Sequence, residues 1–196
     1  MARCTFIGIA LCLVGYGCGG GRGVPAGPDG SFYDFDGGLP DSKMPGCERT
    51  LFNVIGFQPP KGIGEGGVTS PVGADAARLA AIKISEGFNL GYCKAKPGHG
   101  PEMHNHDTNE TFIPMTGTWR ASWEDEKGKV DHVDLGPLDV VSFPPGMIRR
   151  FENVTKGDPN EESILMFVIG GDGPRAEFTD DAMGRLEKAG AWPVRA

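Results

Sequence analysis

The feature that most constrains the fold is a series of short apolar or alternating segments separated by glycine and proline. The chain has 32 glycines and 16 prolines in 196 residues, which suits short strands and tight turns better than a helical bundle. The expected strands cover residues 51–57, 80–84, 88–94, 111–123, 130–133, 140–143, 147–151 and 164–169. The last is a continuous apolar run, typical of a strand buried on both faces. We therefore expect an all-β fold, built as a closed or double-sheet antiparallel barrel.

Two local patterns complete this prediction. The charged residues 124–129 lie between two strand patterns and predict a hairpin turn. Near the C-terminus, Thr179 can cap a helix whose apolar face holds Met183 and Leu186 and which Gly190 can end. We expect one short helix after the strands.

Residues 1–43 show no pattern capable of building a core. Arg3 followed by an apolar stretch at 6–14, too short to span a bilayer, has the shape of an export signal. Cys18 would then resemble the lipidation cysteine of a bacterial lipoprotein, followed by a Gly/Pro-rich tether. The alternative is that translation begins at Met44. The first interpretation predicts an exported or lipid-anchored protein, the second a cytoplasmic one.

Charge and cysteine usage exclude several classes of protein. The formal net charge is −7, and no basic run is longer than the pair Arg149 and Arg150, so we expect neither a nucleic-acid partner nor a basic membrane-binding surface. We also expect no membrane-spanning segment. The five cysteines have neither the spacing of a disulfide framework nor that of a zinc ribbon. They are Cys4, Cys12, Cys18, Cys47 and Cys93.

The strongest chemical signal is a cluster of metal-ligating residues. His104 and His106 are two residues apart, so in a strand both side chains point to the same face. Glu110 keeps that parity if the strand resumes after 107–109, which would place all three on one inner wall. Two imidazoles and a carboxylate form a facial triad that leaves open positions on a divalent metal. His99 and His132 are expected to be ordinary polar surface residues.

The cluster belongs to a longer pattern that resembles the cupin superfamily. Its first motif matches at Gly98, His104, His106, Glu110 and Gly117, and its second matches at Pro144, Gly146 and Asn153. The second motif departs from the family at Arg149, which stands where the fourth metal ligand is usually histidine. The chain is similar to single-domain, type-2 cupins over residues 50–170.

The resemblance implies a fold, a domain arrangement and a cofactor. We expect a cupin jelly-roll, or double-stranded β-helix barrel, at 44–178, preceded by the tail at 1–43 and followed by the C-terminal helix and tail at 179–196. His104, His106 and Glu110 would hold a divalent transition metal. Fe(II) is favoured, and Mn, Ni, Zn and Cu are alternatives. An isolated barrel of this kind is also compatible with a homodimer.

Arg149 decides how the site is interpreted. Its parity with Met147 and Phe151 predicts that it faces the barrel interior, where a guanidinium needs an anion. That anion is either a carboxylate or phosphate of a small substrate, which would make Arg149 part of the catalytic machinery, or an internal carboxylate. The internal candidates are Glu110, Glu102 and Asp139.

These features predict a metal-dependent small-molecule enzyme. Among cupins, an open site with two histidines and one carboxylate implies a dioxygenase-like oxidoreductase acting on a small organic acid or aromatic compound. Two alternatives stay open. One is a non-catalytic cupin that binds a small anionic ligand through Arg149, and the other is a metal-free isomerase or epimerase with His104 or His106 as the base.

Overall fold

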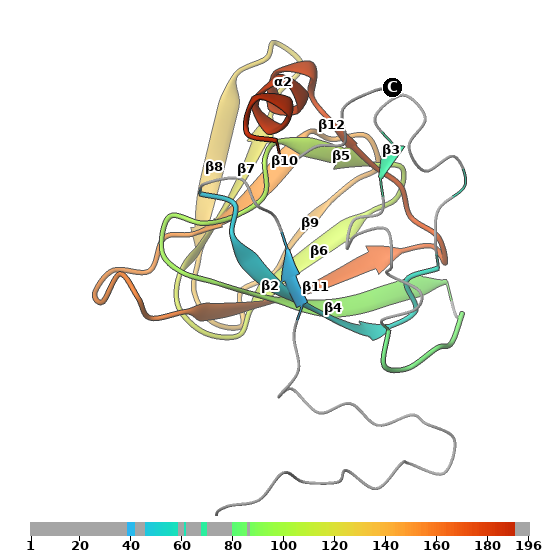
Figure 1. Ribbon diagram of the computed structural model, residues 1–196, viewed down its shortest axis with the longest axis horizontal. Coiled ribbons are helices and arrows are strands. Elements are labelled where there is room, and N and C mark those ends of the chain that lie inside the picture. The colour runs from blue at the N-terminus through green and yellow to red at the C-terminus, as the bar shows by residue number, and fades with distance from the viewer. Residues whose placement is uncertain are drawn as a thin grey trace, which may run out of the picture.

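The computed structural model describes residues 39–41, 46–58, 61, 68–69, 80–85 and 87–190. Within them the chain forms antiparallel strands followed by one C-terminal helix (Figure 1). The strands are β1 (Leu39–Asp41), β2 (Arg49–Ile55), β3 (Val68–Thr69), β4 (Phe88–Ala95), β5 (His104–His106), β6 (Glu110–Pro114), β7 (Trp119–Glu124), β8 (Val130–Leu135), β9 (Val141–Phe143), β10 (Arg149–Asn153), β11 (Ser163–Gly170) and β12 (Ala176–Phe178). The helix is α2 (Asp180–Lys188).

The strands form two six-stranded sheets, in the orders β1-β2-β4-β11-β6-β9 and β3-β12-β5-β10-β7-β8. The sheets enclose an apolar interior, because the strands that face it alternate inward and outward side chains. Phe112 of β6, Phe167 of β11 and Phe151 of β10 meet in this interior and are nearly or fully buried. The expected all-β, double-sheet jelly-roll architecture is confirmed.

The helix forms where the sequence predicts it. Thr179 is the N-cap and its side chain accepts a hydrogen bond from the backbone N–H of Ala182. Met183 and Leu186 are buried, and Gly190 adopts a positive φ of 65° just beyond the helix. Among the described residues, no helix is long and apolar enough to cross a membrane.

Three strand predictions are wrong in part. The segment 111–123 is two strands, β6 and β7, because Gly117 turns the chain with a φ of 71°. The segment 80–84 makes only an isolated bridge, between Ile82 and Ile55. β11 is buried on its inner face alone, whereas its outward side chains, such as Ile164, are half-buried. The hairpin predicted at 124–129 is confirmed as the connection between β7 and β8.

The N-terminal predictions fall largely on residues outside those described. The signal-like segment, Cys18 and Met44 all belong to that group, and the boundary at residue 44 stays a prediction. β1 does lie upstream of this boundary and pairs with β2 through Leu39 and Leu51.

The turn at Gly117 provides a stability prediction. A Cβ at this position would overlap the hydroxyl oxygens of Ser163 and Thr155, which are hydrogen-bonded to each other at 3.0 Å. We expect Gly117→Ala to lower the free energy of unfolding by about 1–3 kcal/mol for the left-handed backbone, plus the cost of this overlap. Gly146→Ala is the matched control, since its φ is 80° but a Cβ would meet nothing within 4 Å. Equal losses for both variants in urea denaturation would contradict the overlap.

Candidate metal centre

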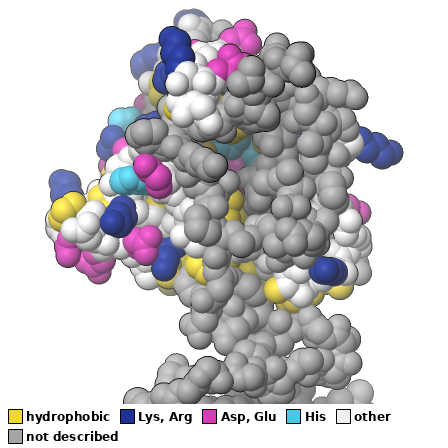
Figure 2. Space-filling view, viewed as in Figure 1, with side chains coloured by type: hydrophobic (Ala, Val, Ile, Leu, Met, Phe, Trp, Pro, Cys, Tyr) yellow, Lys and Arg dark blue, Asp and Glu magenta, His cyan; other side chains and the backbone are white. Residues whose placement is uncertain are grey.

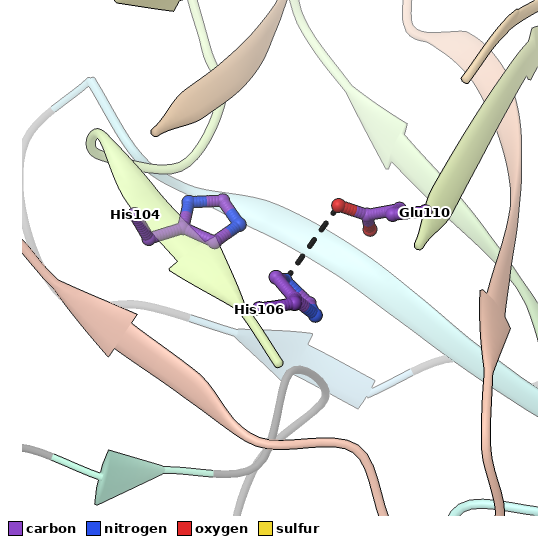
Figure 3. A group of neighbouring side chains, drawn as sticks. All are labelled: His104, His106 and Glu110. Carbon is purple, nitrogen blue, oxygen red and sulfur yellow. Dashed lines mark ion pairs between the residues drawn. The ribbon is translucent and has the colours of Figure 1, made fainter. Parts of the chain in front are cut away.

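The three predicted ligands come together inside the barrel, but from two walls rather than one. His104 and His106 lie on β5 in one sheet, and Glu110 begins β6 in the other. The prediction of a single inner wall is therefore wrong, because residues 107–109 carry the chain from one sheet to the other. The side chains still point toward one another (Figure 3).

The ligand atoms of the three side chains all lie within 4.8 Å of one another, and all three residues are buried. The two imidazole rings are 5.1 Å apart between centroids. The Nε2 atom of His106 is 3.6 Å from Oε2 of Glu110, which is too long for a hydrogen bond. The cluster thus has the size of a metal-ligand set while its members are not joined directly by hydrogen bonds.

His104 is oriented by the backbone before it. Its Nδ1 lies 2.7 Å from the carbonyl oxygen of Glu102. Because a carbonyl can only accept, Nδ1 carries the proton and Nε2 presents its lone pair. Burial, together with the charge of Arg149, lowers the pKa of His104 to about 3. The imidazole is therefore neutral at pH 7, the form that binds metals.

His106 is buried without any hydrogen-bond partner. Neither Nδ1 nor Nε2 has one among the described residues, and the side chain is only 1% exposed. Burial lowers the pKa of its imidazole well below the usual value, and Arg149 adds to this effect. Since buried polar groups nearly always have a partner, an unsatisfied imidazole facing two other ligand atoms fits a metal ion.

Arg149 lies in the same interior, directly opposite His104 in the pairing of β10 with β5. Its Nε and Nη2 donate to Oε2 of Glu110 at 3.2 and 2.9 Å, and its Nη1 donates to the carbonyl of Met147 at 3.2 Å. The inward orientation predicted from parity is confirmed, and the side chain is fully buried. Of the three internal carboxylates considered, Glu110 is the one that pairs with Arg149.

The other two carboxylates have different partners. Glu102 pairs with Arg185 of α2, and Asp139 accepts from the backbone N–H of Gly136. The pairing of Glu102 was not predicted, because its partner is 83 residues away and no local pattern links them.

The charge balance of the site follows from this ion pair. Burial raises the pKa of Glu110 above its usual value, and the guanidinium of Arg149 opposes that rise. Both of its guanidinium contacts use Oε2, and no described residue donates a hydrogen bond to Oε1. A carboxylate has two oxygens with lone pairs on each, so Glu110 can pair with Arg149 and still offer a ligand atom.

The remaining histidines behave as expected for residues outside a metal site. His132 is exposed on β8, and Nε2 of His99 lies 3.3 Å from a carboxylate oxygen of Glu48. On the described part of the face shown in Figure 2, Lys and Arg side chains are interspersed with Asp and Glu rather than gathered in one basic patch.

Comparisons with known proteins identify the fold. Comparison with protein-family models gave no match, and neither did comparison with curated proteins. Among solved structures, an oxalate oxidase aligns over 87% of this chain and 73% of its own length, with 15% identity and a TM-score of 0.53. A Bacillus subtilis oxalate decarboxylase aligns with 27% identity and a TM-score of 0.40. That alignment covers 45% of this chain and only 22% of the decarboxylase. Oxalate oxidase and oxalate decarboxylase are cupins.

Proposed function

Starting from a chain that has the cupin fold, we propose a metal-dependent small-molecule enzyme. His104, His106 and Glu110 hold one divalent transition metal, with Fe(II) favoured and Mn, Ni, Zn and Cu as alternatives. The observation that carries this proposal is the buried imidazole of His106, whose two nitrogens lack partners while the other ligand atoms lie within 4.8 Å. A metal ion satisfies such a group at the position where three donors converge.

The proposed activity is a dioxygenase-like oxidation of a small organic acid or aromatic compound. A metal with three protein ligands supplies open positions for substrate or oxygen and acts as a Lewis acid. The protein supplies a dry interior, since Phe143 and Trp123 pack together with ring centroids 6.1 Å apart. Their packing limits the access of bulk water.

Arg149 is assigned the role of binding the acid. A guanidinium has five N–H groups, and Glu110 and Met147 engage three of them. The remaining two can bind a carboxylate of the substrate in a charge-assisted contact. A divalent cation beside the neutral pair of Arg149 and Glu110 also leaves the interior positively charged, which favours an anionic substrate.

Oxygen uptake tests this activity. The purified protein is loaded anaerobically with Fe(II) or Mn(II), mixed with a panel of small aliphatic and aromatic acids that includes oxalate, and exposed to oxygen. We expect uptake with at least one acid, a loss of at least about 100-fold in His106→Ala, and a raised KM in Arg149→Met. Metal binding without uptake for any acid would contradict the oxidase assignment.

A second candidate function follows from the position of Arg149. Because its guanidinium occupies the place of the fourth metal ligand and pairs with Glu110, the site could work without metal as an isomerase or epimerase, with a neutral histidine as the base. This candidate predicts turnover that is unchanged by chelators. The oxidase assignment predicts that chelators abolish turnover.

A further inference from the structure

The orientation of His104 depends on a residue that is not itself in the site. The carbonyl oxygen of Glu102 accepts the Nδ1 hydrogen bond of His104 at 2.7 Å. β5 is only three residues long, and the register of β10 against it includes a single pair, Arg149 with His104. The segment that precedes β5 therefore needs support from elsewhere to keep this carbonyl in place.

The C-terminal helix provides that support through an ion pair. Nε and Nη2 of Arg185 donate to the two carboxylate oxygens of Glu102 at 3.2 and 2.7 Å. The Glu102 side chain is 11% exposed, so the contact is largely shielded from water on that side. Arg185 also donates to Asp181 one turn earlier, which restricts the guanidinium further.

The helix is itself held firmly over β5. Phe178 of β12 pairs with His104 in the sheet, and their rings are 5.8 Å apart. The backbone N–H of Thr179 donates to the carbonyl of Met103 at 3.3 Å. Ala182, Met183 and Leu186 bury the inner face of the helix. Arg185 is thus attached to a fixed platform next to the ligand strand, as the position of α2 above β5 and β12 in Figure 1 illustrates.

We propose that Arg185 is a positioning residue of the metal centre. By holding the side chain of Glu102, it fixes the backbone carbonyl that keeps Nδ1 of His104 protonated and Nε2 directed into the site. The proposal rests on the metal site argued above and adds the C-terminal helix to its function. Groups that orient a metal-bound histidine are worth about 10- to 100-fold in metal affinity. Arg185 acts one bond network further out, so we expect a loss of about 3- to 10-fold when it is removed.

The experiment compares Arg185→Gln with Arg120→Gln. Arg120 makes the same two-pronged contact, with Asp134 at 2.7 and 2.9 Å, between β7 and β8 and away from the ligands. Co(II) affinity is measured by competition with a chelator, and exchange of the Nδ1 proton of His104 is followed by NMR in the metal-free protein. Glu102→Ala removes the same ion pair from the other side and leaves the backbone carbonyl in place.

The expected result is a 3- to 10-fold weaker affinity for Co(II) and faster exchange of the His104 proton in both Arg185→Gln and Glu102→Ala, with Arg120→Gln within about twofold of the parent. Parent-like exchange and affinity in both site variants would overturn the proposal. Failure of the parent to bind Co(II) would instead contradict the metal site. In that case the exchange of the His104 proton still decides the role of Arg185.

Discussion

Glu110→Gln is expected to lower the free energy of unfolding of the metal-free protein by about 3–5 kcal/mol at pH 7. The variant leaves Arg149 fully buried with no counter-charge, although the amide oxygen can still accept a hydrogen bond. A guanidinium does not lose its proton in a protein, so the buried charge cannot be neutralised. The loss therefore falls on the folded state in full.

Arg149→Met is expected to cost less, about 1–3 kcal/mol. This variant leaves Glu110 unpaired, but a carboxyl group can take up a proton, and burial already raises its pKa. Methionine also fills part of the volume of the arginine. The asymmetry between the two single variants is the specific consequence of a buried pair in which only one partner can become neutral.

Urea denaturation in the presence of a chelator measures both variants together with the double variant Glu110→Gln/Arg149→Met. We expect the double variant to be more stable than Glu110→Gln alone, because no charge stays buried. Arg120→Met is the control, since its pair with Asp134 is exposed and should contribute within about 1 kcal/mol. A Glu110→Gln variant as stable as Arg149→Met would contradict the ion pair described here.

His106→Ala is expected to weaken the binding of a divalent metal by more than about 100-fold, beyond the effect of losing an outer-shell partner. His106 is one of only three protein ligands, so its loss leaves two donors on a site that already lacks a fourth. The imidazole has no hydrogen-bond partner among the described residues, and its removal breaks no internal polar contact. The effect should therefore appear in metal affinity rather than in the fold.

His132→Ala is the matched control for this variant. His132 is exposed on β8 and belongs to no group of ligand atoms among the described residues. Calorimetric titration with Mn(II) or Zn(II) should give the parent affinity for His132→Ala. A His106→Ala variant that binds the same metal as tightly as the parent would place the binding elsewhere in the chain.

The sequence was sufficient to predict the residues of the site but not their placement. The alternation of side chains along a strand relates His104 to His106, and the two motifs add Glu110 and Arg149. Which sheet Glu110 joins depends on the crossing at 107–109, which no local pattern reveals. The pairing of Glu110 with Arg149 was one of several alternatives, since choosing among carboxylates requires the three-dimensional arrangement.

The strands followed the same rule. Segments with strong alternation, such as 88–94 and 147–151, form strands β4 and β10 within one or two residues of the prediction. The segment 80–84 has an apolar run but finds only one bridging partner, Ile55. β12 is too short to show a pattern, yet it pairs with β5 and precedes the helix that bears Arg185. Contacts between distant segments, rather than local propensity, decide these cases.

The central claim is that His104, His106 and Glu110 bind one metal ion. Its most direct test is a titration of the metal-free parent with Co(II), followed by the visible absorption of the bound ion. We predict saturation at one equivalent per chain and loss of this absorption in both His104→Ala and Glu110→Gln, each compared with His132→Ala. An absorption that does not saturate, or one that persists in His104→Ala, would contradict the claim.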